Sequence, residues 1–171
     1  TNNKITILNK IGNLDDFKIR TLYINNISID CIYIDSLCSG DKISSTVMKS
    51  ISWDFKCNFK FDDYFKYLEN SLPNNNLKVL TNIEEILLYL NTGFLIIIVN
   101  NQKVLAVECK ANLDRSISQS TSEPLIKGAK DSFTENFLTN IGLIRRRIKD
   151  NNLQIDSVII GKRTKTKIGI L

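Results

Sequence analysis

The feature that most constrains the fold of this chain is the run 94–99, its longest uninterrupted apolar stretch. Six residues are far fewer than the roughly 20 that a membrane-spanning helix requires, so the run predicts a strand. It is followed by Asn100, Asn101 and Gln102, and then by a second apolar segment at 103–110. Asparagine tolerates the left-handed backbone conformation of tight turns. The two segments therefore predict a strand pair.

Apolar periodicity and turn residues predict the other elements. Strands are expected at 17–23, 27–35, 78–80, 153–161 and 164–171, and helices at 40–51, 62–72 and 131–150. A further helix is expected to begin at the capping box Thr81-x-x-Glu84 and to end near Gly93. Strands and helices intermix throughout, so the predicted fold class is α/β or α+β.

A proline followed by three asparagines at 73–76 predicts a linker. We expect two small subdomains, each a mixed β-sheet packed with helices. The predicted boundaries are 1–72 for an N-terminal α/β subdomain, 73–77 for the linker and 78–171 for a C-terminal α/β subdomain. The segment 112–127 is polar and rich in serine, and it predicts a long ordered loop.

The composition argues against an enzyme. The chain has no histidine, so the commonest general base and metal ligand is missing. None of the four cysteines forms a C-x-x-C pair, and we expect all of them to be free thiols: Cys31, Cys38, Cys57 and Cys109. We therefore expect no catalytic residues, no metal and no cofactor. The net charge of +5 is compatible with an acidic partner but does not identify one.

On the helix expected at 131–150, apolar residues form one stripe that must pack against a sheet. The stripe consists of Phe133, Phe137, Ile141, Ile144 and Ile148. At about 100° per residue, Arg145 and Arg147 flank this stripe on opposite sides, while Arg146 points away from it. We expect the flanking arginines to pair with carboxylates and Arg146 to be exposed for contact with another subunit or lipid. Candidate carboxylates are Glu123, Asp114 and Asp156.

A second basic stretch at 162–167 begins with Lys162 and Arg163 and joins the last two strands. It is expected to be a solvated turn or a basic rim that faces lipid headgroups or an acidic partner. No aromatic residue interleaves the basic stretches, and no helix-turn-helix, RNA-recognition or zinc-finger pattern occurs. Nucleic acid is therefore not an expected partner.

The C-terminal third carries several motifs in a fixed order. They are Arg115, Glu123-Pro124, Lys127-Gly128-Ala129, the set Phe133, Glu135, Phe137, Thr139 and Asn140, the run 143–148, and the set Gly161, Arg163, Lys165 and Thr166. In this order the motifs resemble the signature block of the GerA family of spore germination receptor A subunits. Lys127, Ala129 and Phe137 stand where arginine, proline and leucine are usual in that family.

The resemblance implies that the chain is the cytoplasmic N-terminal domain of the A subunit of a spore germinant receptor. The parent protein would lie in the spore inner membrane, with this soluble domain on the spore-core side. It would act with a permease-like B subunit, a lipoprotein C subunit and other A subunits, near anionic lipid headgroups. Its role would be germinant signalling and the assembly of a receptor or ion channel. Residues expected at interfaces or in structural ion pairs are Glu123, Arg145, Arg146, Arg147, Lys162 and Arg163.

One alternative function stays open at this point. The chain could be a small-molecule binding module that holds the germinant in the cleft between the two subdomains, because clefts between domains are common ligand sites. Saturable binding of a germinant to this chain would favour the alternative.

Overall fold

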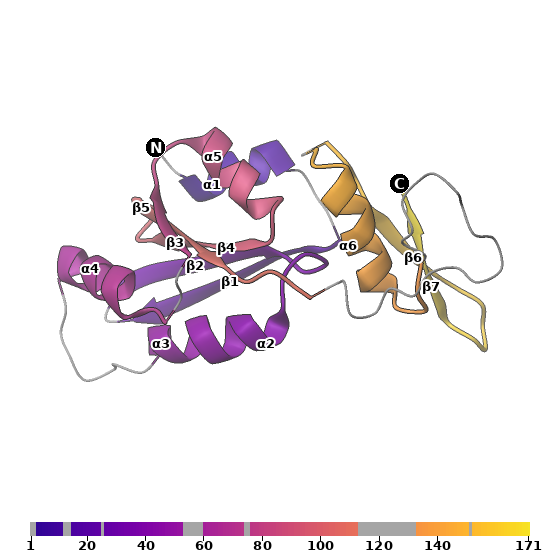
Figure 1. Cartoon of the computed structure of the whole chain (residues 1–171), viewed down its shortest axis with the longest axis horizontal. Helices are drawn as coiled ribbons and strands as arrows, with labels where there is room; N and C mark the ends of the chain where they lie inside the picture. Colours follow the sequence, from indigo (N-terminus) through magenta and orange to yellow (C-terminus); the bar gives the residue numbers. More distant parts are fainter. Residues whose placement is uncertain are drawn as a thin grey trace, which may run out of the picture.

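The computed structural model describes residues 3–11, 15–24, 26–52, 60–73, 76–112, 133–150 and 152–171. Within these residues the strands are β1 (Phe17–Ile24), β2 (Ile27–Ile34), β3 (Leu77–Leu80), β4 (Phe94–Val99), β5 (Lys103–Glu108), β6 (Asp156–Ile160) and β7 (Thr166–Ile170). Five of them form one sheet in the order β1-β2-β4-β5-β3, and β6 and β7 form a separate hairpin (Figure 1). Helices accompany both sheets, which confirms the predicted mixed α/β class.

The strand pairing does not follow the boundary expected at 73–77. Strand β2 pairs with β4 across that boundary, with Ile29 opposite Val99 and Ile32 opposite Ile96. The expectation of a separate mixed sheet in each half is therefore corrected: one five-stranded sheet spans both halves, and every strand pair is antiparallel. A polar segment with proline and asparagine looks the same in sequence whether it links domains or turns the chain within one.

Strand β4 occupies the centre of the sheet, and all six of its residues are buried. Side chains alternate between the two faces of a strand, so both faces of β4 need a covering layer. Leu95, Ile97 and Val99 contribute to one apolar core. The intervening residues contribute to a second core on the opposite face. The apolar run 94–99 is therefore a central strand that is buried on both sides.

Two groups of helices supply the covering layers (Figure 1). One face carries α1 (Asn3–Ile11) and α5 (Ile83–Leu90). The other carries the continuous helical segment α2 (Gly40–Lys42), η1 (Ile43–Met48) and α3 (Lys49–Ser52), together with α4 (Phe61–Ser71). The middle of the continuous segment, η1, is a π-helix. Helix α1 was not predicted from the sequence, although Ile7 and Ile11, which are four residues apart, are both buried on one side of it.

Two helix N-termini differ from their predicted form. Helix α5 begins one residue later than the expected capping box requires, and the Asn82 side chain caps it by accepting a hydrogen bond from the Glu84 backbone N–H at 3.0 Å. Helix α6 (Phe137–Arg147) begins six residues later than the helix expected at 131–150, and Asn136 caps it by accepting from the Thr139 N–H at 3.1 Å. Asparagine offers the same side-chain acceptor as serine or threonine at this position.

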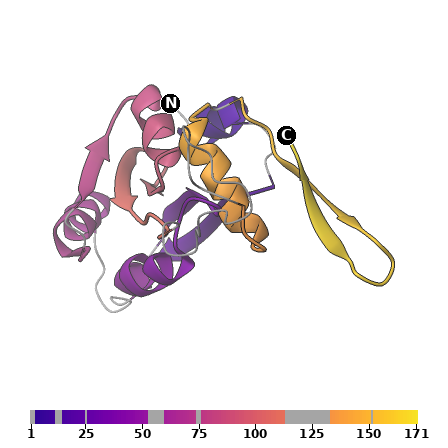
Figure 2. The ribbon, with the colours of Figure 1, turned by 45° about the vertical axis from the view of Figure 1, so that its right-hand side comes forward.

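Helix α6 and the β6–β7 hairpin lie together beside the main sheet, and the hairpin extends away from the body (Figure 2). Helix α6 packs on β7, where Phe137 covers Gly169. The turn of the hairpin uses positive φ angles at Gly161 and Lys165, of 91° and 46°. The long loop expected at 112–127 lies, apart from residue 112, outside the described residues.

Candidate functional site at the junction of helix α6 and the main sheet

Two consecutive carboxylates, Asp15 and Asp16, lie in the turn that precedes β1 and point to different partners. Asp16 and Arg145 of α6 are both buried, with only 3% and 2% of their surfaces exposed. Arg145 donates two hydrogen bonds to this carboxylate, from Nε to Oδ2 at 2.7 Å and from an Nη to Oδ1 at 2.8 Å. Such a bidentate pair fixes orientation as well as charge. It joins residues that are 129 positions apart in the sequence.

The ion pair is completed by polar groups from the surrounding turns. The Ser36 hydroxyl donates to Asp16 Oδ2 at 2.7 Å. The Asp35 backbone N–H donates to the backbone carbonyl of Asp16 at 2.7 Å, which holds the turn itself. A second Arg145 Nη donates a longer bond, at 3.4 Å, to the Leu153 carbonyl. Buried charges need such additional hydrogen bonds because they have lost the water that would otherwise solvate them.

Asp15 fastens the hairpin to the same turn. Its Oδ2 accepts a hydrogen bond from the Ser157 backbone N–H at 2.7 Å and another from the Ser157 hydroxyl. The hydroxyl bond, followed by the backbone bond, lowers the pKa of the Asp15 carboxyl below its ordinary value. We call residues 15 and 16 the carboxylate turn. The carboxylate of Asp16 binds Arg145 of α6, and the carboxylate of Asp15 binds Ser157 of β6.

The structure places Arg145 in a carboxylate pair of the expected kind, with a partner that the sequence analysis missed. Glu123 and Asp114 lie outside the described residues, and Asp156 is exposed on β6. No local pattern marks Asp16 as the partner, because the pair exists only when the two ends of the chain meet. The one available hint is a pair of adjacent acids directly before a strand.

The buried side of α6 is rotated from the predicted stripe. Ile141, Leu143 and Arg145 are buried, whereas Phe133 precedes the helix and is 69% exposed and Ile148 follows it and is 49% exposed. The expectation that both aromatic rings and all three isoleucines pack on a sheet is therefore wrong for the two ends of the stripe. Position 145 lies four residues after 141 and so on the same face, which carries the arginine inward to the buried carboxylate.

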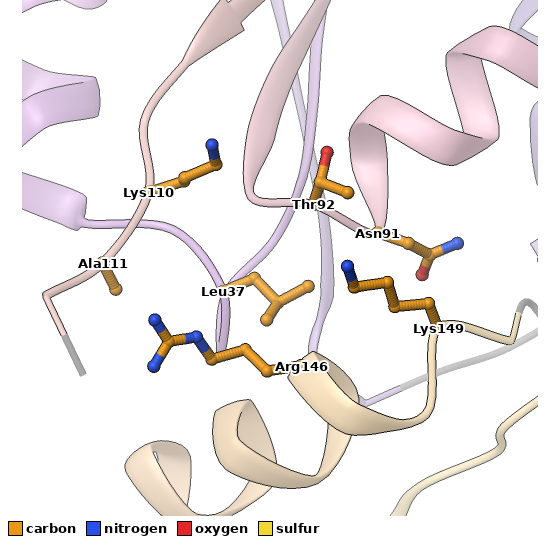
Figure 3. A pocket seen from close by; sticks show the side chains of 7 residues that line it. All are labelled: Leu37, Asn91, Thr92, Lys110, Ala111, Arg146 and Lys149. Carbon is orange, nitrogen blue, oxygen red and sulfur yellow. The ribbon is translucent and has the colours of Figure 1, made fainter. Parts of the chain in front are cut away.

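The neighbouring arginines lie at the surface. Arg147 is exposed, and it lines a shallow hollow with Phe133 and Leu143. Its pairing with a carboxylate stays a prediction. Arg146 is exposed as expected, and it lines a pocket of about 320 Å³ between α6 and the main sheet (Figure 3). Lys162 and Arg163 are exposed in the turn of the hairpin.

We call the five-stranded sheet and the helices that cover it the main sheet unit, and the described cysteines are buried within this unit. Cys31, Cys38 and Cys109 are free thiols, and burial raises the pKa of Cys31 to about 12 and that of Cys109 to about 11. Such thiols are poor nucleophiles because little thiolate forms at neutral pH. In the described part of the chain, no group of three or more histidine, cysteine, aspartate or glutamate side chains is arranged to hold a metal ion. Cys57 lies outside the described residues.

These features define a mixed α/β domain in which a helix and a hairpin are held to the edge of an antiparallel sheet by the carboxylate turn. The family described as Bacillus/Clostridium GerA spore germination protein matches residues 5–171. The chain therefore belongs to the GerA family of spore germination proteins. Across the ranges that the structure describes, no helix is both long enough and apolar enough to cross a membrane.

A solved structure and several curated proteins resemble the chain. The crystal structure of the N-terminal domain of the A subunit of the Bacillus megaterium spore germinant receptor GerK3 matches 97% of this chain and 61% of that chain, with a TM-score of 0.72 and 26% identity. Stage V sporulation protein AF of Bacillus subtilis is 25% identical over 94% of this chain and 32% of its own length. Spore germination protein XA of Bacillus anthracis is 54% identical over 33% of this chain and 12% of its own length. The chain thus spans about a third or less of these curated relatives.

Proposed function

We propose that this chain is the N-terminal domain of the A subunit of a spore germinant receptor and that its role is non-catalytic. In this proposal the domain takes part in receptor assembly and passes conformational changes between subunits. The parent protein lies in the spore inner membrane with this domain on the cytoplasmic side. The similarity to the solved A-subunit domain over 97% of the chain supports the assignment.

The observation that carries the proposed role is the fastening of α6 and the hairpin to the sheet by the carboxylate turn. Moving α6 relative to the sheet would separate Arg145 from Asp16, which are both buried. Leaving one member of a buried ion pair without its partner costs about 3–5 kcal/mol. A force applied to the hairpin is therefore transmitted to the sheet instead of being absorbed at the junction.

The hairpin offers the surface on which such a force would act. Its inner side packs on α6, where Lys167 lies over the Phe137 ring at 4.8 Å. Its opposite side presents Val158, Ile160, Ile168 and Ile170, which are each between 41% and 56% exposed. Contiguous exposed apolar surface rimmed by charge is typical of protein interaction sites. We assign this face, with the basic turn at Lys162 and Arg163, to contact with another receptor subunit.

Site-specific crosslinking in spores tests this assignment. Cysteine replaces Lys162 in the full-length protein, and spores are treated with a thiol-to-amine crosslinker before the products are identified by mass spectrometry. Cysteine in place of Lys66 is the matched control, since Lys66 is also an exposed lysine but lies on α4, far from the hairpin (Figure 1).

Capture of another germinant receptor subunit from position 162, but not from position 66, supports the proposal. A crosslink from position 162 only to a later part of the same polypeptide contradicts the assignment, because the face would then pack within its own chain. Equal capture from both positions also contradicts it.

A further inference from the structure

Strand β3 forms a free edge of the main sheet unit. Within the described residues it pairs with β5 alone, as the last strand of the order β1-β2-β4-β5-β3. Figure 2 shows it at the outside of the sheet. Its residues are exposed or partly exposed except Leu80. An edge strand presents unpaired backbone N–H and C=O groups, to which another chain can bond.

The hydrogen bonds between β3 and β5 determine which of these backbone groups point outward. The Glu108 N–H donates to the Asn76 carbonyl at 3.1 Å, directly before β3. Along an antiparallel pair, residues that bond to the partner strand alternate with residues that do not. Counted from Asn76, every second residue bonds to β5, so Leu77 and Val79 direct their N–H and C=O groups away from the sheet. No described residue hydrogen-bonds to these outward groups.

A hollow of about 670 Å³ lies between the free edge of β3 and helix α4, and we call it the β3 groove. Val79 lines it and is 47% exposed, and Phe65 lines it from the helix. The charged residue of β3, Lys78, lies on the opposite face of the sheet, with its ammonium 5.3 Å from the centre of the Tyr89 ring. A lysine on an edge strand discourages pairing with another chain, but this one does not line the groove. The groove therefore offers an apolar contact beside unpaired backbone groups.

Of the two charged residues that line the β3 groove, one is already compensated within the chain. The Lys103 ammonium is 2.7 Å from an Asp62 carboxylate oxygen and lies over the Phe61 and Phe65 rings, at 5.4 and 4.9 Å. Glu69, in the last turn of α4, is exposed, and no described cation lies within ion-pair distance of it. The groove thus presents one negative charge that a cationic side chain of a partner can neutralise.

We propose that the β3 groove binds an extended peptide segment of another protein, which adds to the sheet as a further antiparallel strand. The outward N–H and C=O of Val79 bond to one residue of this segment, and the side chain of that residue then lies on the α4 side of the sheet. This side chain is aliphatic, because it packs against Val79 and Phe65. Residues two positions apart in a strand lie on the same face, about 7 Å from each other, so a lysine or arginine two positions away is placed to pair with Glu69.

The backbone groups favour a peptide over a compact ligand. The outward groups of Leu77 and Val79 repeat at the spacing of a strand, and an extended backbone repeats its donors and acceptors at the same spacing. All pairs among the described strands are antiparallel, which supports the same direction for the added strand. The inference does not rest on the proposed receptor role, because the strand, the groove and Glu69 belong to this chain alone.

Fluorescence anisotropy with a labelled peptide tests the inference on the chain itself. The probe is Thr-Lys-Thr-Val-Thr-Lys-Thr with blocked ends, in which the valine and both lysines lie on one face of an extended chain. Two methylated probes form a matched pair: one carries N-methyl on the valine, and the other carries it on the threonine that follows. In the antiparallel arrangement the valine N–H faces β3 and the threonine N–H faces away.

Two charge reversals of the chain complete the test. Glu69→Lys changes the groove and adds a cation near the end of a helix, where it is tolerated. Glu135→Lys is the matched control, because it reverses another exposed glutamate outside the groove. Thermal melts monitored by circular dichroism check that both variants remain folded. Sedimentation velocity of the chain alone shows whether a second copy occupies the edge.

Saturable binding supports the inference if methylation of the valine weakens it at least about tenfold and methylation of the threonine less than about twofold. Glu69→Lys should weaken binding at least about threefold, Glu135→Lys should not, and a probe with glutamate for both lysines should prefer Glu69→Lys. Absence of saturable binding overturns the inference, as does equal weakening by both methylations or by both variants. A dimer of the chain that Val79→Lys disperses, without binding of the probe, overturns it in favour of a second copy.

Discussion

Replacing Arg145 by methionine is expected to destabilise the domain more than the same replacement at any other arginine that the structure describes. Methionine keeps an unbranched side chain of similar length but leaves the Asp16 carboxylate buried without its cation. Both partners are almost fully buried, at 2% and 3% exposure, and the pair has two hydrogen bonds of 2.7 and 2.8 Å. Removing one partner of such a pair costs about 3–5 kcal/mol.

Urea unfolding of the chain, followed by circular dichroism, measures this loss. The same loss can be measured by thermal unfolding. For a protein of this size, 1 kcal/mol of unfolding free energy corresponds to about 2–4 °C in Tm, so a loss of about 3–5 kcal/mol should lower Tm by roughly 6–20 °C. Arg147→Met is the matched control. Arg147 is exposed, and exposed ion pairs contribute at most about 1 kcal/mol, so its replacement should change the free energy of unfolding by less than that.

A double-mutant cycle distinguishes the ion pair from the packing of the arginine side chain. Asp16→Leu alone should also be costly, since it leaves Arg145 as a buried unpaired cation. The double variant should lose at least about 2 kcal/mol less than the sum of the two single variants, because neither charge is then left alone. Additive losses, or a loss below about 1 kcal/mol for Arg145→Met, would refute the view that this pair holds α6 to the sheet.

Three further predictions concern the main sheet unit. Asn82→Ala should reduce the free energy of unfolding by about 1 kcal/mol in urea titrations, whereas Thr81→Ala should have a smaller effect, because Asn82 is the residue that caps α5. Gly93→Ala should destabilise by more than about 1 kcal/mol in the same assay, since φ is +84° and an added Cβ would lie 2.9 Å from the Leu37 carbonyl oxygen; an unchanged midpoint would contradict this. Cys31 and Cys109 should resist alkylation by iodoacetamide at pH 8 in the folded chain and react after unfolding, because their raised pKa values keep the thiols protonated until the pH approaches about 12 and about 11. Peptide mapping by mass spectrometry measures this protection, and rapid labelling of the native protein would show that the thiols are accessible.

Local patterns were sufficient to predict most elements of the main sheet. The apolar run at 94–99 predicted a strand, and the structure shows that strand with all six residues buried. The asparagines after it predicted a turn, and Asn100 and Asn101 adopt positive φ angles of 48° and 57°. These predictions succeeded because strand burial and turn conformation depend on residues that are adjacent in the sequence.

The beginning of α6 was harder to predict from the sequence. The apolar period continues upstream to Phe133, but the helix begins only after the Asn136 cap. The apolar period indicates that a helix is present, but it does not show the residue at which the helix begins. That residue depends on side-chain hydrogen bonds that compete with the backbone hydrogen bonds of the helix. Here Thr134 and Asn140 bond to each other and turn the chain before the helix, with Thr134 N–H donating to Asn140 Oδ1 at 2.7 Å.

The sequence by itself determined that the chain contains an apolar strand pair at 94–110, that its C-terminal third carries a basic helix, and that its motifs resemble one family. Only the tertiary structure decided that both halves share one sheet and that Arg145 turns inward to Asp16. Strand order and long-range ion pairs depend on which surfaces meet after the chain has folded. A residue 129 positions away exerts no influence on local pattern, so the partner of a buried charge becomes visible only in three dimensions.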